Sequence, residues 1–111
     1  MEPYAAIAGH LHKEKVYQAA WCEQHGGVTE YRLDDGTRVD CLTDEYAIEF
    51  DFAPKWAESV GQSLYYAERT GKLPGVVLIM EYAYDNRYAK RLDALAQRYH
   101  IKVWQLVPNR L

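Results

Sequence analysis

Three acidic residues on two neighbouring predicted strands are the side chains whose types and spacing best suit chemistry. Asp40 lies in segment 37–42, and Glu49 and Asp51 lie in the apolar segment 46–52. Because side chains alternate faces along a strand, Glu49 and Asp51 share one face. Two carboxylates on a strand suited to burial are costly unless a cation compensates them. The pattern therefore predicts a site for a hard divalent cation held by carboxylate oxygens.

Extended geometry brings these acids within reach of one another. The Cα atoms of Glu49 and Asp51 are expected about 6–7 Å apart, with Asp40 roughly 5 Å away on the adjacent strand. Their carboxylates can converge on one ion, or on two ions about 3.5–4 Å apart. The backbone carbonyl of Phe50 is a further candidate ligand. Two alternatives stay open: a solvated strand face for Asp40, and a cation with a purely structural role.

The helix expected after the second strand adds polar side chains on one face. Lys55, Gln62 and Tyr66 follow one another at i, i+7 and i+11, which places them on the same side of a helix. A lysine there can hold a water molecule or neutralise developing charge, and Gln62 and Tyr66 can touch a phosphate or a base. The alternatives are a plain salt bridge between Asp51 and Lys55, or a surface position for Lys55.

The remaining segments form the elements that must position these residues. Hydrophobic periodicity and Gly, Pro and Asp-Gly signals set their limits. The order αβββαβαβ predicts one α/β domain over residues 1–111, with a mixed central sheet flanked by helices. The expected elements are a helix from Tyr4 to about Gln24, strands 28–33, 37–42 and 46–52, a helix from Pro54 to about Thr70, a buried strand 75–80, a helix 86–99 and a strand 101–107.

Helical and strand periodicity also predict which side chains face the core. In segment 37–42, Val39 and Cys41 are expected on one face, opposite Asp40. The apolar stripe of the first helix is predicted to contain Tyr4, Ile7, Leu11, Gln18 and Cys22, with Glu14 beside it, and that of the third helix Tyr88, Leu92, Leu95 and Tyr99. Surface positions are expected for His10 and His12, and Arg87, Lys90, Arg91 and Arg98 are interpreted as a solubilising face.

Composition limits the classes of partner and compartment. The net charge of −3 excludes a global basic field that would draw the protein to nucleic acid, so such binding would need a local patch or a metal. No apolar run is long enough for a bilayer, and the start of the chain lacks the features of a signal peptide, which predicts the cytoplasm and no membrane. Cys22 and Cys41 lack metal-type spacing and are predicted to be reduced structural thiols.

The element order together with these acids resembles the PD-(D/E)XK nuclease superfamily, whose restriction-endonuclease-like core is a helix, a β-meander, a helix and a strand. The resemblance covers the first helix to about Met80. It implies that Asp40 and Glu49 bind Mg²⁺ or Mn²⁺. The position of the superfamily's catalytic lysine holds Asp51, and Lys55 is the candidate replacement. Gln62 followed by Tyr65 and Tyr66 is similar to a motif of RecB-like exonucleases.

Further expectations concern Glu14, the activity of the protein and its assembly. Some members add a glutamate from the first helix, and Glu14 is the candidate here, with a capping or solvent role as the equal alternative. The resemblance implies a metal-dependent nuclease acting on DNA, with a homodimer by analogy to junction resolvases of similar size. The alternative function is an inactive nuclease fold that serves as a binding module for protein or nucleic acid. Tyr82 and Tyr84 are candidates for an oligomer interface.

Overall fold

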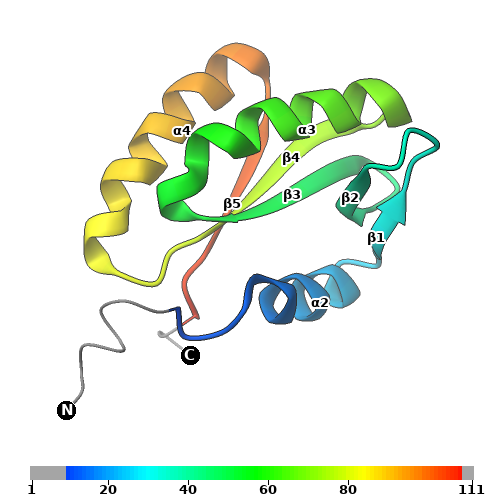
Figure 1. Ribbon diagram of the computed structural model, residues 1–111. Helices are drawn as coiled ribbons and strands as arrows, with labels where there is room; N and C mark the ends of the chain where they lie inside the picture. Colours follow the sequence, from blue (N-terminus) through cyan, green and yellow to red (C-terminus); the bar gives the residue numbers. More distant parts are fainter. Residues whose placement is uncertain (1–9, 109–111) are drawn as a thin grey trace.

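The computed structural model describes residues 10–108, which form a three-layer α/β arrangement around one five-stranded sheet. Helix α2 covers one face of the sheet, and α3 and α4 lie side by side on the other (Figure 1). This confirms the predicted α/β class and the helix-flanked mixed sheet. The elements are α2 (Glu14–Gln24), β1 (Val28–Arg32), β2 (Arg38–Leu42), β3 (Tyr46–Phe52), α3 (Trp56–Thr70), β4 (Leu73–Ile79), α4 (Asn86–Tyr99) and β5 (Lys102–Leu106).

The sheet changes from antiparallel to parallel at its central strand. The strand order is β1-β2-β3-β4-β5, with antiparallel pairs from β1 to β3 and parallel pairs from β3 to β5. Tight turns join the antiparallel strands, whereas α3 and α4 are the crossovers that parallel neighbours require. The apolar run in β4 is buried from Gly75 onward because helices cover both faces.

Two apolar clusters hold the layers together. On the α2 side, Trp21 packs with Ile48, Phe50 and Val77. On the other side, Val76 and Leu78 of β4 pack with Leu92 of α4 and with half-buried side chains of α3. The alternation along β3 is as expected: Ile48 and Phe50 face α2, which leaves Glu49 and Asp51 on the opposite side. The sheet therefore presents two acids toward the α3 face.

Within the described residues, the segment predicted as one helix from Tyr4 to about Gln24 is helical only from Glu14 onward. Residues 10–13 form a bent segment, helix α2 starts at Glu14, and Leu11 is 47% exposed. The backbone N–H of Leu11 donates to the carboxylate of Glu81 (2.8 Å), and the His10 ring stacks on Phe52 at 3.4 Å between centroids. These tertiary contacts replace a helical turn. The predicted positions of Tyr4 and Ile7 lie outside the described residues.

The stripe predicted for the last helix is correct in its middle and wrong at its end. Leu92 is fully buried and Tyr88 and Leu95 are half-buried, whereas Tyr99 is 47% exposed. Ala89 and Ala96 occupy the core instead. Small side chains suit this contact because they let α4 approach the neighbouring layer closely. His100 then ends the helix in the left-handed conformation (φ 57°).

The two cysteines form a disulfide, so the prediction of free thiols is wrong. Cys22 of α2 and Cys41 of β2 are both fully buried, with their Cα atoms 5.8 Å apart. A Cβ at Gly27 would lie 2.5 Å and 2.7 Å from the two sulfur atoms, so only glycine fits beside the bridge. The disulfide ties α2 to the strand that carries Asp40.

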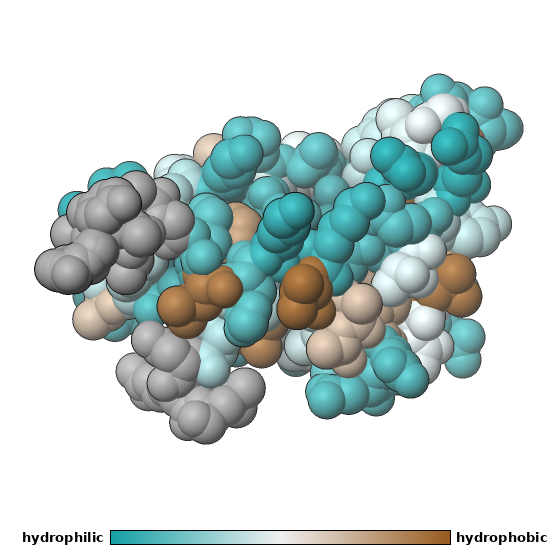
Figure 2. Space-filling model, turned by 60° about the horizontal axis from the view of Figure 1, so that its bottom comes forward, coloured by the Kyte–Doolittle hydropathy of each residue, from teal (hydrophilic) through white to brown (hydrophobic). Residues whose placement is uncertain are grey.

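The surface on the α2 side is mainly hydrophilic, with apolar residues in separate patches (Figure 2). Exposed apolar side chains there include Val16 of α2. Within residues 10–108, every helix is too short or too polar to cross a membrane.

Candidate functional site

The β1–β2 hairpin is distorted where Glu30 faces Asp40. Glu30 has a φ of 53°, which non-glycine residues seldom adopt, while regular pairs flank it on both sides. The amide of Gln18, which is 3% exposed, fills the distortion: its Nε2 donates to the Glu30 carboxylate (2.7 Å) and to the backbone carbonyl of Asp40 (2.9 Å). A buried glutamine from α2 therefore holds two adjacent strands in an irregular geometry.

This irregularity changes the faces predicted for β2. Cys41 packs in the α2 cluster, as expected, but Val39 packs with Ala47 of β3 and Tyr66 of α3. The prediction that Val39 and Cys41 share a face is therefore wrong. Regular alternation fails because the distortion lies at the residue between them, Asp40.

Asp40 and Glu49 bind the backbone of each other's strand. Regular β2–β3 pairing is present at Cys41 and Leu42 and stops before Asp40. Beyond that point, Asp40 Oδ2 accepts the N–H of Phe50 (2.8 Å), and Glu49 Oε2 accepts the N–H of Asp40 (3.1 Å). The two carboxylates thus take the place of ladder hydrogen bonds, and both strands stay apart enough to admit them.

Asp51 lies two residues further along the same face of β3. Its side chain is 7% exposed, and its Oδ2 atom is buried with no hydrogen-bond partner within the described residues. A buried carboxylate oxygen without a donor is costly. A cation or a proton bound at Asp51 Oδ2 would compensate for the missing hydrogen bond.

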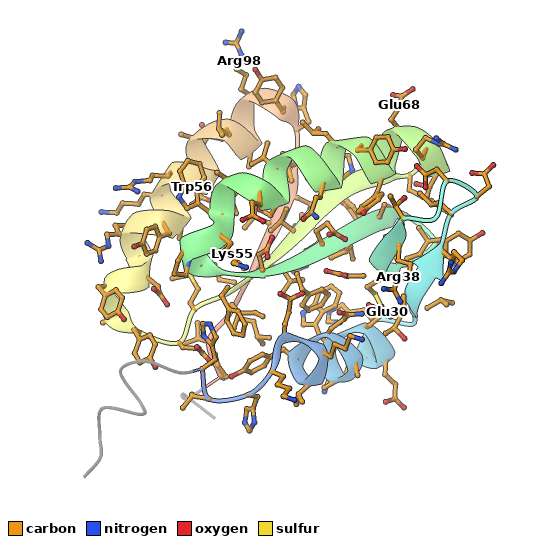
Figure 3. The ribbon with its side chains drawn as sticks, in the orientation of Figure 1. Glu30, Arg38, Lys55, Trp56, Glu68 and Arg98 are labelled. Atoms are coloured by element: carbon orange, nitrogen blue, oxygen red, sulfur yellow. A yellow bond between two sulfur atoms is a disulfide. The ribbon has the colours of Figure 1, made fainter. Side chains whose placement is uncertain are left out.

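A cleft of about 420 Å³ lies over these three acids. It runs between α2 on one side and α3 on the other, with the β1–β2 hairpin at its end (Figure 3). The lining side chains are mostly polar. They include Glu14, Lys15 and Gln18 of α2, Glu30, Arg38 and Asp40 of the hairpin, Glu49, Phe50 and Asp51 of β3, and Glu58, Gln62 and Tyr66 of α3.

Of the remaining predicted site residues, Gln62 and Tyr66 line the cleft and Lys55 does not. Gln62 lines the cleft and is exposed, whereas Tyr66 lines it while being only 7% exposed, packed against Val39 and Ala47. Lys55 lies outside the lining, at the start of α3, exposed and pointing toward the sheet (Figure 3).

Burial, together with the charges of neighbouring acids, raises the pKa values of the three cleft acids. Burial raises the pKa of Glu49 to about 9, and the carboxylates of Asp40 and Asp51 add to the rise. Burial first and Glu14 second raise the pKa of Asp51 to about 7, against a smaller opposing effect of Lys55. Burial likewise raises the pKa of Asp40 to about 7. Without a cation, the cleft favours protonated carboxyl groups.

Glu14 belongs to this charge cluster. It is half-buried on α2, and burial raises its pKa, while Lys55 lowers it. Glu14 also raises the pKa of Asp40, Glu49 and Asp51 by its charge. Glu14, the site residue predicted from the first helix, therefore lies close enough to the acidic strands to influence them by its charge.

Sequence reasoning missed several polar residues of the cleft, among them Gln18, Glu30 and Arg38. Gln18 was placed in an apolar stripe, and a polar side chain in such a stripe was the signal that could have marked it as a buried hydrogen-bonding group. Glu30 and Arg38, whose side chains approach to 3.4 Å, gave no comparable signal. Their roles depend on the distorted hairpin, which spacing along the chain does not encode.

The donor set suits a hard cation. Within residues 10–108, no three acidic, histidine or cysteine side chains surround a common point closely enough to form a ready-made metal cage. The acids of the floor nevertheless offer only oxygen donors, as Mg²⁺ and Mn²⁺ prefer, and Asp51 Oδ2 has no other partner. Asp40, Glu49 and Asp51 are the residues that could hold such an ion.

No protein-family model, curated protein or solved structure matches this chain. What the cleft can do follows from its own residues.

Proposed function

We propose that this protein is a metal-dependent nuclease that hydrolyses phosphodiester bonds, with DNA as its substrate. One observation carries the proposal: two buried carboxylates and a half-buried one, from two adjacent strands, share the floor of an open cleft with too few cations to balance them. A divalent cation would balance the negative charge of the carboxylates. Binding of a substrate phosphate beside that cation would explain why the cleft is open.

Asp40, Glu49 and Asp51 are the proposed ligands of Mg²⁺ or Mn²⁺, with the Phe50 carbonyl and Glu14 as additional ones. Bound there, such an ion would supply charge neutralisation at phosphate and activation of water. The protein's own contribution is to hold the carboxylates. The Phe50 and Asp40 N–H groups fix two of them, and the β2–β3 separation keeps them facing the cleft.

The residues of α3 receive graded roles. Gln62 is exposed on the cleft wall and is proposed to contact a phosphate or base. Burial raises the pKa of Tyr66, with Glu49 and Asp40 adding to it, so its hydroxyl remains a protonated donor. Lys55 acts through charge, since it opposes the raised pKa of Asp51 and Glu14. We propose Lys55 as a stabiliser of negative charge near the cleft mouth.

The element order supports a nuclease-type core. From α2 to β4 the chain follows the helix, meander, helix and strand order of the restriction-endonuclease-like fold, and we propose that fold for it. A homodimer and a cytoplasmic location remain predictions. The disulfide weighs against the cytoplasm, because disulfides persist mainly in oxidising compartments.

A second candidate is a binding module that has lost catalysis. Asp51 stands where the superfamily has its lysine, and Lys55 lies outside the cleft lining. Such a module would bind its partner equally well with or without metal, and equally well after Glu49 is replaced.

The deciding experiment is a cleavage assay on linear, supercoiled and branched DNA with Mg²⁺, Mn²⁺ or chelator. The wild type is compared with Glu49→Gln, which keeps the shape but removes the charge, and with Glu68→Gln as a control. Glu68 is an exposed acid on the far side of α3 (Figure 3). We expect metal-dependent cleavage that Glu68→Gln retains and Glu49→Gln loses by at least about 100-fold. Cleavage that survives in chelator or in Glu49→Gln would overturn the proposal, as would absent cleavage together with absent metal binding by calorimetry.

A further inference from the structure

The start of α4 and the turn before it carry planar side chains in an unbroken row. The Arg87 guanidinium lies 5.3 Å from the ring centroid of Tyr84 and 5.1 Å from that of Tyr88, and Arg91 lies 5.5 Å from that of Tyr88. Tyr82 stacks on Tyr84 with the ring planes 3° apart. We call Tyr82, Tyr84, Arg87, Tyr88 and Arg91 the cation–aromatic ladder. Helical spacing puts its last four members on one face.

The cations of this surface are not neutralised by neighbouring acids. Arg87, Lys90 and Arg91 are exposed and make no ion pair within the part of the chain that the structure describes. The nearest acids in sequence are Asp85 and Asp93. Asp85 is 2% exposed, and its Oδ2 accepts the backbone N–H of residues 81 and 82, whereas Asp93 is exposed on α4 but pairs with none of these cations within the described residues. By contrast, Arg69 of α3 is paired with Asp34 at 2.8 Å. The ladder region therefore carries uncompensated positive charge on a protein of net charge −3.

The combination of charge and flat aromatic surface selects a class of partner. Guanidinium groups bind phosphates, and tyrosine rings stack on bases. Tyr84 is 53% exposed, more than Tyr82 or Tyr88, although Tyr82 and Arg87 already contact its ring. A duplex hides the faces of its bases, whereas a single strand presents bases and phosphates together. The ladder thus suits single-stranded nucleic acid better than a duplex or a sulfated polysaccharide.

The turn that begins α3 connects the region of the ladder to the region of the acidic cleft. This turn, η1 (Ala53–Lys55), packs on α4, with Ala53 in one cluster with Ala89 and Tyr88. Trp56 points toward α4 and Lys55 toward the sheet (Figure 3). Lys55, in turn, is the cation that acts on Asp51. A nucleic-acid strand bound on the ladder would pass Lys55 before reaching the acidic cleft.

We propose that the cation–aromatic ladder binds single-stranded nucleic acid and leads it across Lys55 to the acidic cleft. The delivery step rests on the proposed nuclease function, whereas the binding step does not. The substrate class of the cleft would accordingly be a single strand or a single-stranded end.

Binding is tested on the full chain carrying Glu49→Gln, in chelator, so that no cleavage is required. Fluorescence anisotropy follows a labelled 20-nucleotide single strand, the same sequence as a duplex, and heparin as competitor over a range of salt. The ladder variants are Arg87→Gln with Arg91→Gln, and Tyr84→Ala. The matched control is Arg98→Gln, because Arg98 makes an isolated contact with Tyr99 (5.8 Å) at the other end of α4. Circular dichroism confirms that each exposed substitution leaves the fold intact.

The ladder predicts three results. The single strand binds more tightly than the duplex. The double arginine variant lowers the affinity for the single strand at least about tenfold. It also lowers the slope of log affinity against log salt concentration by roughly 1.4, the value for two phosphate contacts. Tyr84→Ala weakens single-strand binding by about 5- to 100-fold with little effect on heparin. Arg98→Gln stays at the parent affinity.

Other results overturn the proposal. They are equal losses in the ladder variants and Arg98→Gln, absence of binding at low salt, tighter binding of the duplex, or heparin binding that depends on Tyr84 as strongly as the single strand does. If ladder-dependent binding is seen but wild-type protein cleaves nothing, the nuclease function fails and the binding site stands. If the wild type cleaves DNA and the ladder variants bind normally, the ladder fails alone.

Discussion

Two buried glutamates in neighbouring parts of this sheet have opposite surroundings. Glu81, just after β4, is 3% exposed and accepts hydrogen bonds from His10 Nδ1 (2.7 Å), the Leu11 N–H (2.8 Å) and the Tyr17 hydroxyl (2.8 Å). Glu49, in β3, is 4% exposed, and its carboxylate accepts the Asp40 N–H at 3.1 Å. Glu81 thus joins the segment before α2 to the sheet, whereas Glu49 faces the acidic cleft.

The difference teaches how to distinguish a buried acid that holds the fold together from one that we propose to bind a cation. Burial is nearly the same, so exposure alone does not separate them. Donors surround Glu81, and its main effect is to position α2. Few donors reach Glu49, and like charges lie beside it, so its charged form requires a cation from outside.

The largest expected effect tests this contrast directly. Glu81→Gln should lower the free energy of unfolding by about 3–5 kcal/mol, because it removes one partner of a buried charged network. Glu49→Gln should leave stability in chelator unchanged or higher, since the folded protein no longer has to protonate a buried carboxyl group whose pKa is about 9. Urea unfolding of both variants at pH 8 measures the difference. Equal destabilisation by the two substitutions would show that the contrast is wrong.

The disulfide fixes the position of α2 on the sheet. Helix α2 in turn carries Tyr17, which binds Glu81, and Gln18, which binds Asp40 beside Glu49. Replacing Cys22 and Cys41 by serine should cost roughly 3 kcal/mol, the value for a bridge that closes a loop of this length. Chemical denaturation of the double variant, beside the wild type with and without reductant, gives the value. Rapid reaction of both thiols in the native, untreated protein would show that the bridge does not form.

Stability should depend on pH through the cleft acids. Their pKa values of about 7 for Asp40 and Asp51 and about 9 for Glu49 lie above the ordinary value near 4, so between these limits the folded protein binds more protons than the unfolded chain. In chelator, this stability is complete below about pH 4 and is lost progressively as the pH rises through the folded-state pKa values of 7 to 9.

Thermal unfolding at several pH values tests this dependence. Millimolar Mg²⁺ should restore stability at high pH, and Glu49→Gln should flatten the curve above pH 7, while Glu68→Gln keeps the wild-type profile. A metal-free protein that becomes more stable from pH 5 to pH 9 would contradict the charge crowding of the cleft.

The smallest expected effect concerns Lys55, which reaches the cleft only by its charge. Lys55→Met should reduce cleavage about tenfold, the equivalent of one pKa unit, and should move the acidic limb of the pH–rate profile upward because Asp51 and Glu14 lose a cation. Asp51→Lys should not raise activity above the wild type. Full loss of cleavage with an unshifted profile would instead indicate that Lys55 contacts the reacting groups.

Local signals were enough for the elements and for part of the floor of the cleft. Strand 46–52 and helix 86–99 coincide with β3 and α4, because alternation, helical periodicity and flanking turn residues lie within the segments themselves. The shared face of Glu49 and Asp51 follows from strand periodicity alone. The end of α3 follows from another local signal, Gly71, which adopts the left-handed conformation with a φ of 73°.

Contacts between distant segments decided the rest. His10 and Glu81 are 71 residues apart, and their bond changes where the first helix begins. The Cys22–Cys41 bridge and the Gln18 contact with Asp40 exist because α2 packs on the distorted hairpin, where Glu30 has a positive φ. The sequence by itself determined the order of helices and strands and the pairing of Glu49 with Asp51 on one face. Strand spacing also predicted Asp40 beside them, but only tertiary packing decided how Asp40 is held there, because its position depends on hydrogen bonds from α2 and β3 that no local pattern contains.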